Sequence, residues 1–124
     1  MASRGKGARA KGAAFERTIA ATLTEATGKE WKRGLAQTRG GGAETADVVC
    51  DSISGFHIEA KNQKRCNIKA AMEQAEHDIE ESKSNAMPIV ITKDTGCDTL
   101  VTMKLADWLK LWTHFLDEIR ETKS

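Results

Sequence analysis

The hydrophobic positions near the N-terminus recur at helical spacing. Phe15, Ile19 and Leu23 lie four residues apart, so they fall on one face of a helix. This helix is expected to start near Gly12 and to stop at Gly28, because glycine favours helix ends over helix interiors. A single amphipathic helix of this kind predicts an element that packs one face on a larger core.

The period of the hydrophobic pattern changes from helical to alternating after this helix. Residues 46–51 and 56–61 alternate apolar and polar side chains, which predicts two strands joined as a hairpin by the short connection "SISG". A weaker strand is expected over residues 30–37. Three consecutive glycines make residues 38–45 a loop, since they favour no regular element.

Helical spacing returns in the second half of the chain. Asn67 is expected to cap a helix over residues 68–82, and a buried strand should follow over residues 88–94. A strand at "TLVTM" and a last helix over residues 104–120 complete the order α-β-β-β-α-β-β-α. The strand–helix–strand unit predicts parallel pairing with a right-handed crossover. The expected fold is therefore a single α/β domain with a mixed central sheet flanked by helices.

The last predicted helix carries a wide apolar face. Such a face is typical of packing in a core or a subunit interface rather than of stacking on nucleic-acid bases. Its members are Leu105, Trp108, Leu109, Trp112, Phe115, Leu116 and Ile119.

Composition narrows the class of protein. The chain has 124 residues, of which 40% are hydrophobic and 30% charged, and this suits one domain with a core. No apolar run approaches the ~18 residues of a membrane-spanning helix, and the N-terminus lacks the apolar segment of a secretion signal. Three widely spaced cysteines fit neither a disulfide framework nor a paired zinc motif. We expect an intracellular, cytoplasmic protein.

The charge is unevenly distributed along the chain. Residues 1–42 hold nine Lys and Arg against three Asp and Glu, whereas residues 43–124 hold ten against fifteen. A basic N-terminal part on an acidic chain suggests a polyanionic partner such as DNA, although a solubilising tail would give the same pattern. Residues 1–11 are expected to form a flexible basic arm ahead of a domain over residues 12–124. The basic side chains of this arm are Arg4, Lys6, Arg9 and Lys11.

Three charged residues on the predicted hairpin could form a site. Glu59 and Lys61 lie two residues apart on one strand face, and Asp47 of the partner strand can lie near both. Two carboxylates beside a lysine suit a hard cation such as Mg²⁺, which takes oxygen ligands. A surface cluster of salt bridges remains the alternative for these residues when they are taken alone.

Three segments together resemble a known superfamily. "KGAAFERTIA" at 11–20, "RGGGAETADVV" at 39–49 and "FHIEAKNQ" at 56–63 resemble the PD-(D/E)xK nucleases, most closely the archaeal-type Holliday junction resolvases and their phage relatives. The chain has Ala46 where the superfamily motif has proline. The resemblance implies a restriction-endonuclease-like fold and a Mg²⁺-dependent endonuclease, with Mn²⁺ able to substitute, that acts as a homodimer on branched DNA such as four-way junctions.

The resemblance also implies roles for individual residues. Glu16, Asp47, Glu59 and the Ala60 carbonyl would hold the metal, and Lys61 would be the catalytic lysine. Gln74 lies on the predicted helix after this strand, where many members of the superfamily have a glutamine that supports the site. A restriction-like or nicking endonuclease, or a non-cleaving DNA-binding subunit of a recombination complex, are the alternative functions.

Other polar residues are candidates for DNA contact or metal binding. Arg39 in the glycine-rich loop could clamp a phosphate, as could Lys64 and Arg65 after the catalytic strand. Asp51 shares the face of Asp47, but its place beside the turn favours a role in the turn. No metal role is expected for the histidines: His57 should face solvent or DNA, and His77 and His114 should lie on helix surfaces.

Overall fold

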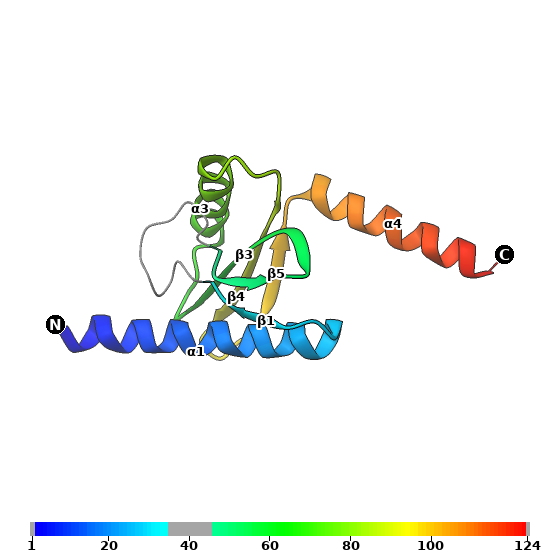
Figure 1. The fold of residues 1–124 in the computed structure, drawn as a ribbon. Coiled ribbons are helices and arrows are strands. Elements are labelled where there is room, and N and C mark those ends of the chain that lie inside the picture. The colour runs from blue at the N-terminus through cyan, green and yellow to red at the C-terminus, as the bar shows by residue number, and fades with distance from the viewer. Residues whose placement is uncertain (1, 35–45, 124) are drawn as a thin grey trace.

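The computed structural model describes residues 2–34 and 46–123, and it has a five-stranded mixed sheet with helices on both faces (Figure 1). The strands lie in the order β1-β2-β3-β4-β5; β3 and β4 are parallel, and the other pairs are antiparallel. This confirms the predicted fold class and element order. The elements are α1 (Ala2–Thr27), β1 (Trp31–Arg33), β2 (Val48–Cys50), β3 (Ile53–Gln63), α3 (Ile68–Glu81), β4 (Met87–Asp94), β5 (Leu100–Met103) and α4 (Leu105–Lys123).

The main apolar core lies between α1 and one face of the sheet. Side chains alternate along a strand, so Ile58 and Ala60 of β3 face α1, whereas His57 and Glu59 face the opposite side. There α3 packs, and its Asp78 lies 3.9 Å from His57. The central strand therefore presents an apolar row to one helix and a charged row to the other. The core residues are Phe15, Ile19, Ala20, Val48, Ile58, Ala60 and Ile91.

Helix α1 begins ten residues earlier than the sequence pattern predicts. It starts at Ala2, so the segment expected to be a flexible arm forms the first turns of the helix instead. Alanine, lysine and arginine dominate this segment, and these residues have high helix propensity, which offsets the cost of Gly5 and Gly7. Helical structure can also extend cheaply from the packed turns around Phe15, because propagation costs less than nucleation.

The hairpin is as predicted in pairing but not in its turn. β2 pairs antiparallel with β3, and an irregularity in register lies between Val48 and Cys50. The turn is at Asp51 and Ser52, so β3 already starts at Ile53, and most of the expected connection is strand. Further along the chain, Asn67 caps α3 as predicted, since its side chain accepts a hydrogen bond from the Ala70 N–H.

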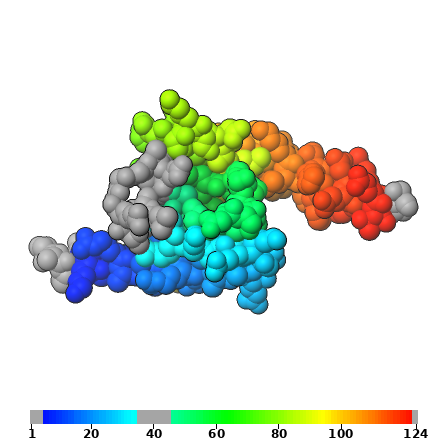
Figure 2. All heavy atoms as spheres, viewed as in Figure 1, coloured from blue at the N-terminus to red at the C-terminus, as the bar shows by residue number. Residues whose placement is uncertain are grey.

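Helix α4 stands apart from the rest of the molecule (Figures 1 and 2). Trp108, Trp112 and Phe115 stack on one another at 5.5 Å between ring centroids, yet they remain 42–50% exposed. Of the two packing roles expected for this face, a place in the core of the same chain is excluded, because α4 leaves the sheet edge after β5 instead of folding back onto it. A subunit interface stays a prediction. Among the described residues, no helix is both long and apolar enough to cross a membrane.

Candidate active site

A cavity of about 470 Å³ opens between α1 and the C-terminal part of β3. Glu16 of α1, Asp47 just before β2, and Ala60 and Lys61 of β3 all line it. These residues lie up to 45 positions apart in the sequence, and the hairpin and the packing of α1 bring them together. The remaining lining residues are Ala8, Lys11, Gly12, Asn62, Gln63 and Lys64.

Asp47 is the most strongly constrained acidic residue of this cavity. Its Oδ2 accepts a hydrogen bond from the Ala60 N–H at 2.8 Å, and its own N–H donates to the Ile58 carbonyl at 2.8 Å. Burial raises the pKa of Asp47 to about 7; the negative charges of Glu59 and, to a lesser degree, Glu16 act in the same direction. The hydrogen bond from Ala60 opposes this shift, as does the nearby positive charge of Lys61. The predicted convergence of Asp47 with Glu59 and Lys61 thus exists in the fold.

Glu16 reaches the cavity from α1 and is held there by an arginine. Its Oε1 accepts a hydrogen bond from the Arg33 Nε at 2.8 Å, and the Glu16 side chain is only 9% exposed. Sequence reasoning missed Arg33. The sequence shows Arg33 only as a basic residue in a short predicted strand. No local pattern indicates that this strand packs beside α1.

Glu59 lies on the same face as Lys61 but is more deeply buried. It is 3% exposed, and its Oε1 meets the Nε2 of His57 at 3.2 Å. His57 is 7% exposed, so the expectation of a solvated or DNA-facing histidine is wrong. The reason is that α3 covers this face of β3 and places Asp78 beside the imidazole.

Gln74 lies on α3 and contacts Asp78 rather than the residues of the cavity. Its Nε2 donates a hydrogen bond to Asp78 Oδ1 at 2.9 Å, one helical turn away. Asp78 in turn lies 3.9 Å from His57. Gln74 is thereby linked to Glu59 through two intervening side chains. Sequence reasoning also missed Asp78, although its helical spacing from Ala71 and Ala75 places it on the buried face of α3.

The basic residues expected to contact DNA lie in different parts of the structure. Lys11 and Lys64 are exposed on the wall of the cavity, and Arg65 is exposed beside them. Lys6 and Arg9 are exposed on the first turns of α1. The positions of Arg39 and of the Arg4 side chain lie outside the described part of the structure.

The other weighed polar residues lie on the surface. The Asp51 side chain is 84% exposed in the hairpin turn and pairs with Lys32 at 3.1 Å, which fits the expected role in the turn. His77 and His114 are exposed on helices, each beside a glutamate four residues on.

A family model described as "Phage putative PDDEXK endonuclease" matches residues 7–123, which is nearly the whole chain. The chain belongs to this family. The match supports the PD-(D/E)xK superfamily and the activity of an endonuclease, and DNA is the substrate that this activity implies. No curated protein and no solved structure matches the chain.

Nucleases of the PDDEXK class generally use divalent metal ions, and the residues of this cavity fit such an ion. Glu16 and Asp47 line the cavity, and the buried Glu59 lies close by; burial first, and then the charges of Glu59 and Glu16, raise the pKa of Asp47. Carboxylate oxygen atoms are the preferred ligands of Mg²⁺. A divalent cation would therefore relieve the repulsion that the fold builds into this site.

Proposed function

We propose that the protein is a Mg²⁺-dependent endonuclease that hydrolyses phosphodiester bonds in branched DNA, above all in four-way junctions. The observation that carries this proposal is that Glu16, Asp47 and Lys61 line one open cavity together with Lys11 and Lys64, while the buried Glu59 lies close enough for its charge to act on Asp47. Cleavage of a phosphodiester needs both groups of side chains: the carboxylates hold a cation, and the lysines attract the DNA backbone.

Glu16, Asp47, Glu59 and the Ala60 carbonyl would hold the ion. When bound, a divalent cation supplies Lewis-acid polarisation of the phosphoryl group and lowers the pKa of an attacking water. The hydrogen bond from the Ala60 N–H fixes the orientation of Asp47, so this ligand is preorganised. Arg33 does the same for Glu16.

Lys61 would act directly on the reacting phosphate. Lys61 lines the cavity, so its ammonium group could stabilise the negative charge that develops on the phosphoryl oxygens or orient the attacking water. Glu59 and Lys61 alternate with buried Ala60 on β3, which aims both polar groups to the same side. Attack by water would leave 5′-phosphate and 3′-hydroxyl ends.

The exposed basic residues would guide the DNA. Lys11 and Lys64 flank the cavity, and Lys6 and Arg9 extend the positive charge along α1. Contacts of this kind neutralise phosphates without reading sequence, which suits recognition by the shape of the DNA.

We propose further that the active form is a two-fold dimer of this chain. A four-way junction presents paired cleavage points, and a two-fold dimer supplies two matching sites. The exposed apolar face of α4 supports this, because monomeric proteins rarely leave such a face open to water. Trp112→Lys should give a monomer by light scattering, whereas exposed Glu121→Lys, on the same helix, should leave the dimer intact.

The decisive experiment compares labelled four-way junction, flap and linear duplex with Mg²⁺ or with chelator, using wild-type protein and the Asp47→Asn variant. We expect Mg²⁺-dependent cleavage of the junction by the wild type alone. Equal cleavage of linear duplex would favour a restriction-like or nicking endonuclease. Tight binding of all three substrates without cleavage would favour a non-cleaving DNA-binding subunit and overturn the proposal.

A further inference from the structure

A second group of metal-ligating side chains lies between β3 and α3. His57 Nε2, a Glu59 carboxylate oxygen and an Asp78 carboxylate oxygen all lie within 4.8 Å of one another. All three residues are buried, with exposures of 7%, 3% and 9%. Within the described ranges, neither Glu59 nor Asp78 forms an ion pair with a lysine or arginine. Two buried carboxylates therefore share a single imidazole as their ionic partner.

The spacing of these atoms is close to that of a metal site with three protein ligands. Zinc bonds of about 2.0–2.2 Å in a tetrahedron place ligand atoms about 3.4 Å apart. His57 Nε2 lies 3.2 Å from Glu59 Oε1 and 3.9 Å from Asp78 Oδ2. Small side-chain rotations would bring all three onto one ion. An imidazole in the ligand set favours Zn²⁺ and related transition metals over Mg²⁺, which prefers oxygen.

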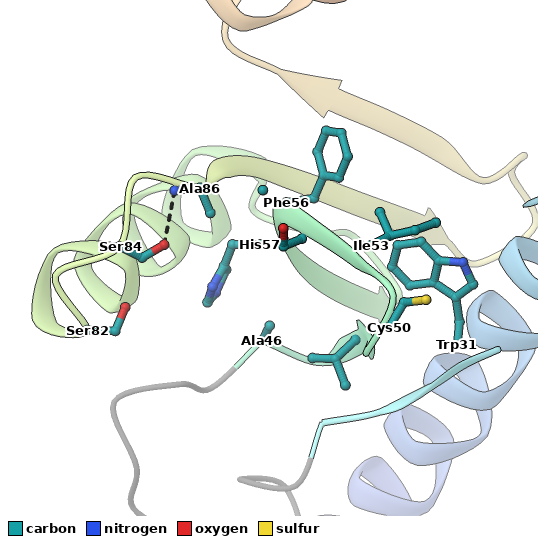
Figure 3. A pocket seen from close by; sticks show the side chains of 12 residues that line it. Trp31, Ala46, Cys50, Ile53, Phe56, His57, Ser82, Ser84 and Ala86 are labelled. Carbon is teal, nitrogen blue, oxygen red and sulfur yellow. Dashed lines mark hydrogen bonds between the residues drawn. The ribbon is translucent and has the colours of Figure 1, made fainter. Parts of the chain in front are cut away.

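Two surrounding features also suit a metal site. The Gln74 amide donates to Asp78 Oδ1, which leaves Oδ2 directed toward His57, and metal-binding carboxylates are commonly held by such hydrogen bonds. His57 also lies on the wall of a cavity of about 270 Å³, which Ser82 and Ser84 line as well (Figure 3). The imidazole thus connects the group to a cavity next to it, and a site with three protein ligands leaves the fourth position for water.

We propose that His57, Glu59 and Asp78 bind a dication of the Zn²⁺ type at a second site, which shares Glu59 with the Asp47 site and takes its other two ligands from His57 and Asp78. The Glu59 carboxylate could contact an ion at either site. The proposal for the second site does not depend on nuclease activity at the first. A bound ion would cross-link α3 to β3 and fix the position of Glu59. Its binding would also neutralise the charge of two buried carboxylates, which should stabilise the fold.

The test is titration calorimetry with ZnCl₂ on metal-free protein. The exposed His77, His114 and Cys97 could bind Zn²⁺ adventitiously, so the starting protein carries His77→Asn, His114→Asn and Cys97→Ser. We expect one bound Zn²⁺ per chain. His57→Gln and Asp78→Asn should each abolish this binding, and Gln74→Ala should weaken it about 10- to 100-fold, as expected for the loss of an orienting partner. Asp47→Asn should leave it intact.

Each outcome decides the matter. Absence of Zn²⁺ binding in the starting protein, or unchanged binding in the His57 and Asp78 variants, would show that the three residues form only a hydrogen-bonded network. Loss of binding in Asp47→Asn would place the ion at the other site and also overturn the proposal. Circular dichroism without metal identifies a variant that fails to fold, and Gln74→Ala, which changes an exposed side chain, then serves as the test. Cleavage in Mg²⁺ is measured separately, so the proposed function and this site can fail independently.

Discussion

The Nε of Arg33 donates a hydrogen bond to Oε1 of Glu16 at 2.8 Å, and this pair joins β1 to α1 at the edge of the candidate active site. The Glu16 side chain is nearly buried, and among the described residues Arg33 is its ion-pair partner. The two residues are 17 positions apart, and the pair depends on how α1 packs against β1.

Loss of Arg33 should therefore affect both stability and activity. Arg33→Ala leaves a buried carboxylate unpaired, which should cost about 1–3 kcal/mol of folding free energy. Loss of an orienting partner should also lower the cleavage rate about 10- to 100-fold. Urea unfolding and single-turnover cleavage measure the two effects. Arg17→Ala, which removes an exposed arginine of α1, is the matched control, and a similar small effect in both variants would refute a positioning role.

Asp47 and Glu59 should be required for cleavage but not for DNA binding. Asp47→Asn and Glu59→Gln each remove a carboxylate ligand while preserving shape, and each reduces the negative charge that faces the phosphate. We expect no detectable cleavage and unchanged or tighter junction binding in a gel-shift assay. Asp51→Asn should behave as the wild type, because Asp51 is exposed and pairs with Lys32. Cleavage by either site variant at near wild-type rate would refute the assignment.

Lys61 should contribute to the chemical step. Lys61→Ala removes one positioned charge, and such a loss typically lowers the rate ~10²–10³-fold. Binding of Mg²⁺, measured by calorimetry, should persist because the carboxylates remain. Lys32→Ala provides the control, since this lysine is exposed and pairs with Asp51 in the hairpin turn. A rate change below about threefold would return Lys61 to an ordinary salt-bridge role.

The stability of the metal-free protein should fall as the pH rises toward 7. The pKa of Asp47 is about 7 in the folded state and 3.8 ordinarily, so between these values the folded protein keeps a proton that the unfolded chain has lost. Rising pH then favours unfolding, with a slope of at most about 1.4 kcal/mol per pH unit. Asp47→Asn should remove this effect.

Thermal melts at pH 4 and pH 8 test this dependence. Relative to wild type, the Asp47→Asn variant should be more stable at pH 8 than at pH 4, with chelator present at both. Mg²⁺ should stabilise the wild type at pH 8 but not the variant, because it replaces the proton as partner of the carboxylate. A difference between the two proteins that does not change with pH would contradict the assignment of the raised pKa.

Glycine should be required at position 34, because the backbone there lies against the backbone of Ala46. A Cβ at this position would lie 2.0 Å from the Ala46 carbonyl oxygen, and the Gly34 N–H donates to the Asp47 carbonyl at 2.9 Å. Gly34→Ala should therefore displace the segment that carries Asp47, at a cost of about 1–3 kcal/mol and with loss of cleavage. Gly5→Ala is the control: nothing lies within 4 Å of a Cβ there, and alanine should stabilise the helix by about 0.5–1 kcal/mol.

Local sequence patterns predicted most helices and strands, and they also predicted that Asp47, Glu59 and Lys61 lie close together. The alternation in residues 56–61 requires Glu59 and Lys61 to share a face whatever packs on the strand, and the hairpin with residues 46–51 brings Asp47 beside them. The cap at Asn67 and the parallel strand after α3 also follow from short-range signals and chain connectivity. The start of α1 did not follow from these signals, because a basic segment that cannot bury a core predicts a flexible arm, whereas its alanine, lysine and arginine residues favour helix.

Only the tertiary structure determined which charged residues pair with one another and which apolar helix face remains exposed to solvent. The sequence by itself determined the strands, the helices and the alternation that aligns Glu59 with Lys61, because these depend on neighbours along the chain. The burial of His57 beside Asp78, the Arg33–Glu16 pair and the exposure of Trp112 on α4 depend on which elements pack together. These contacts join residues far apart in sequence, and their energies depend on burial and distance, which no local pattern of residues encodes.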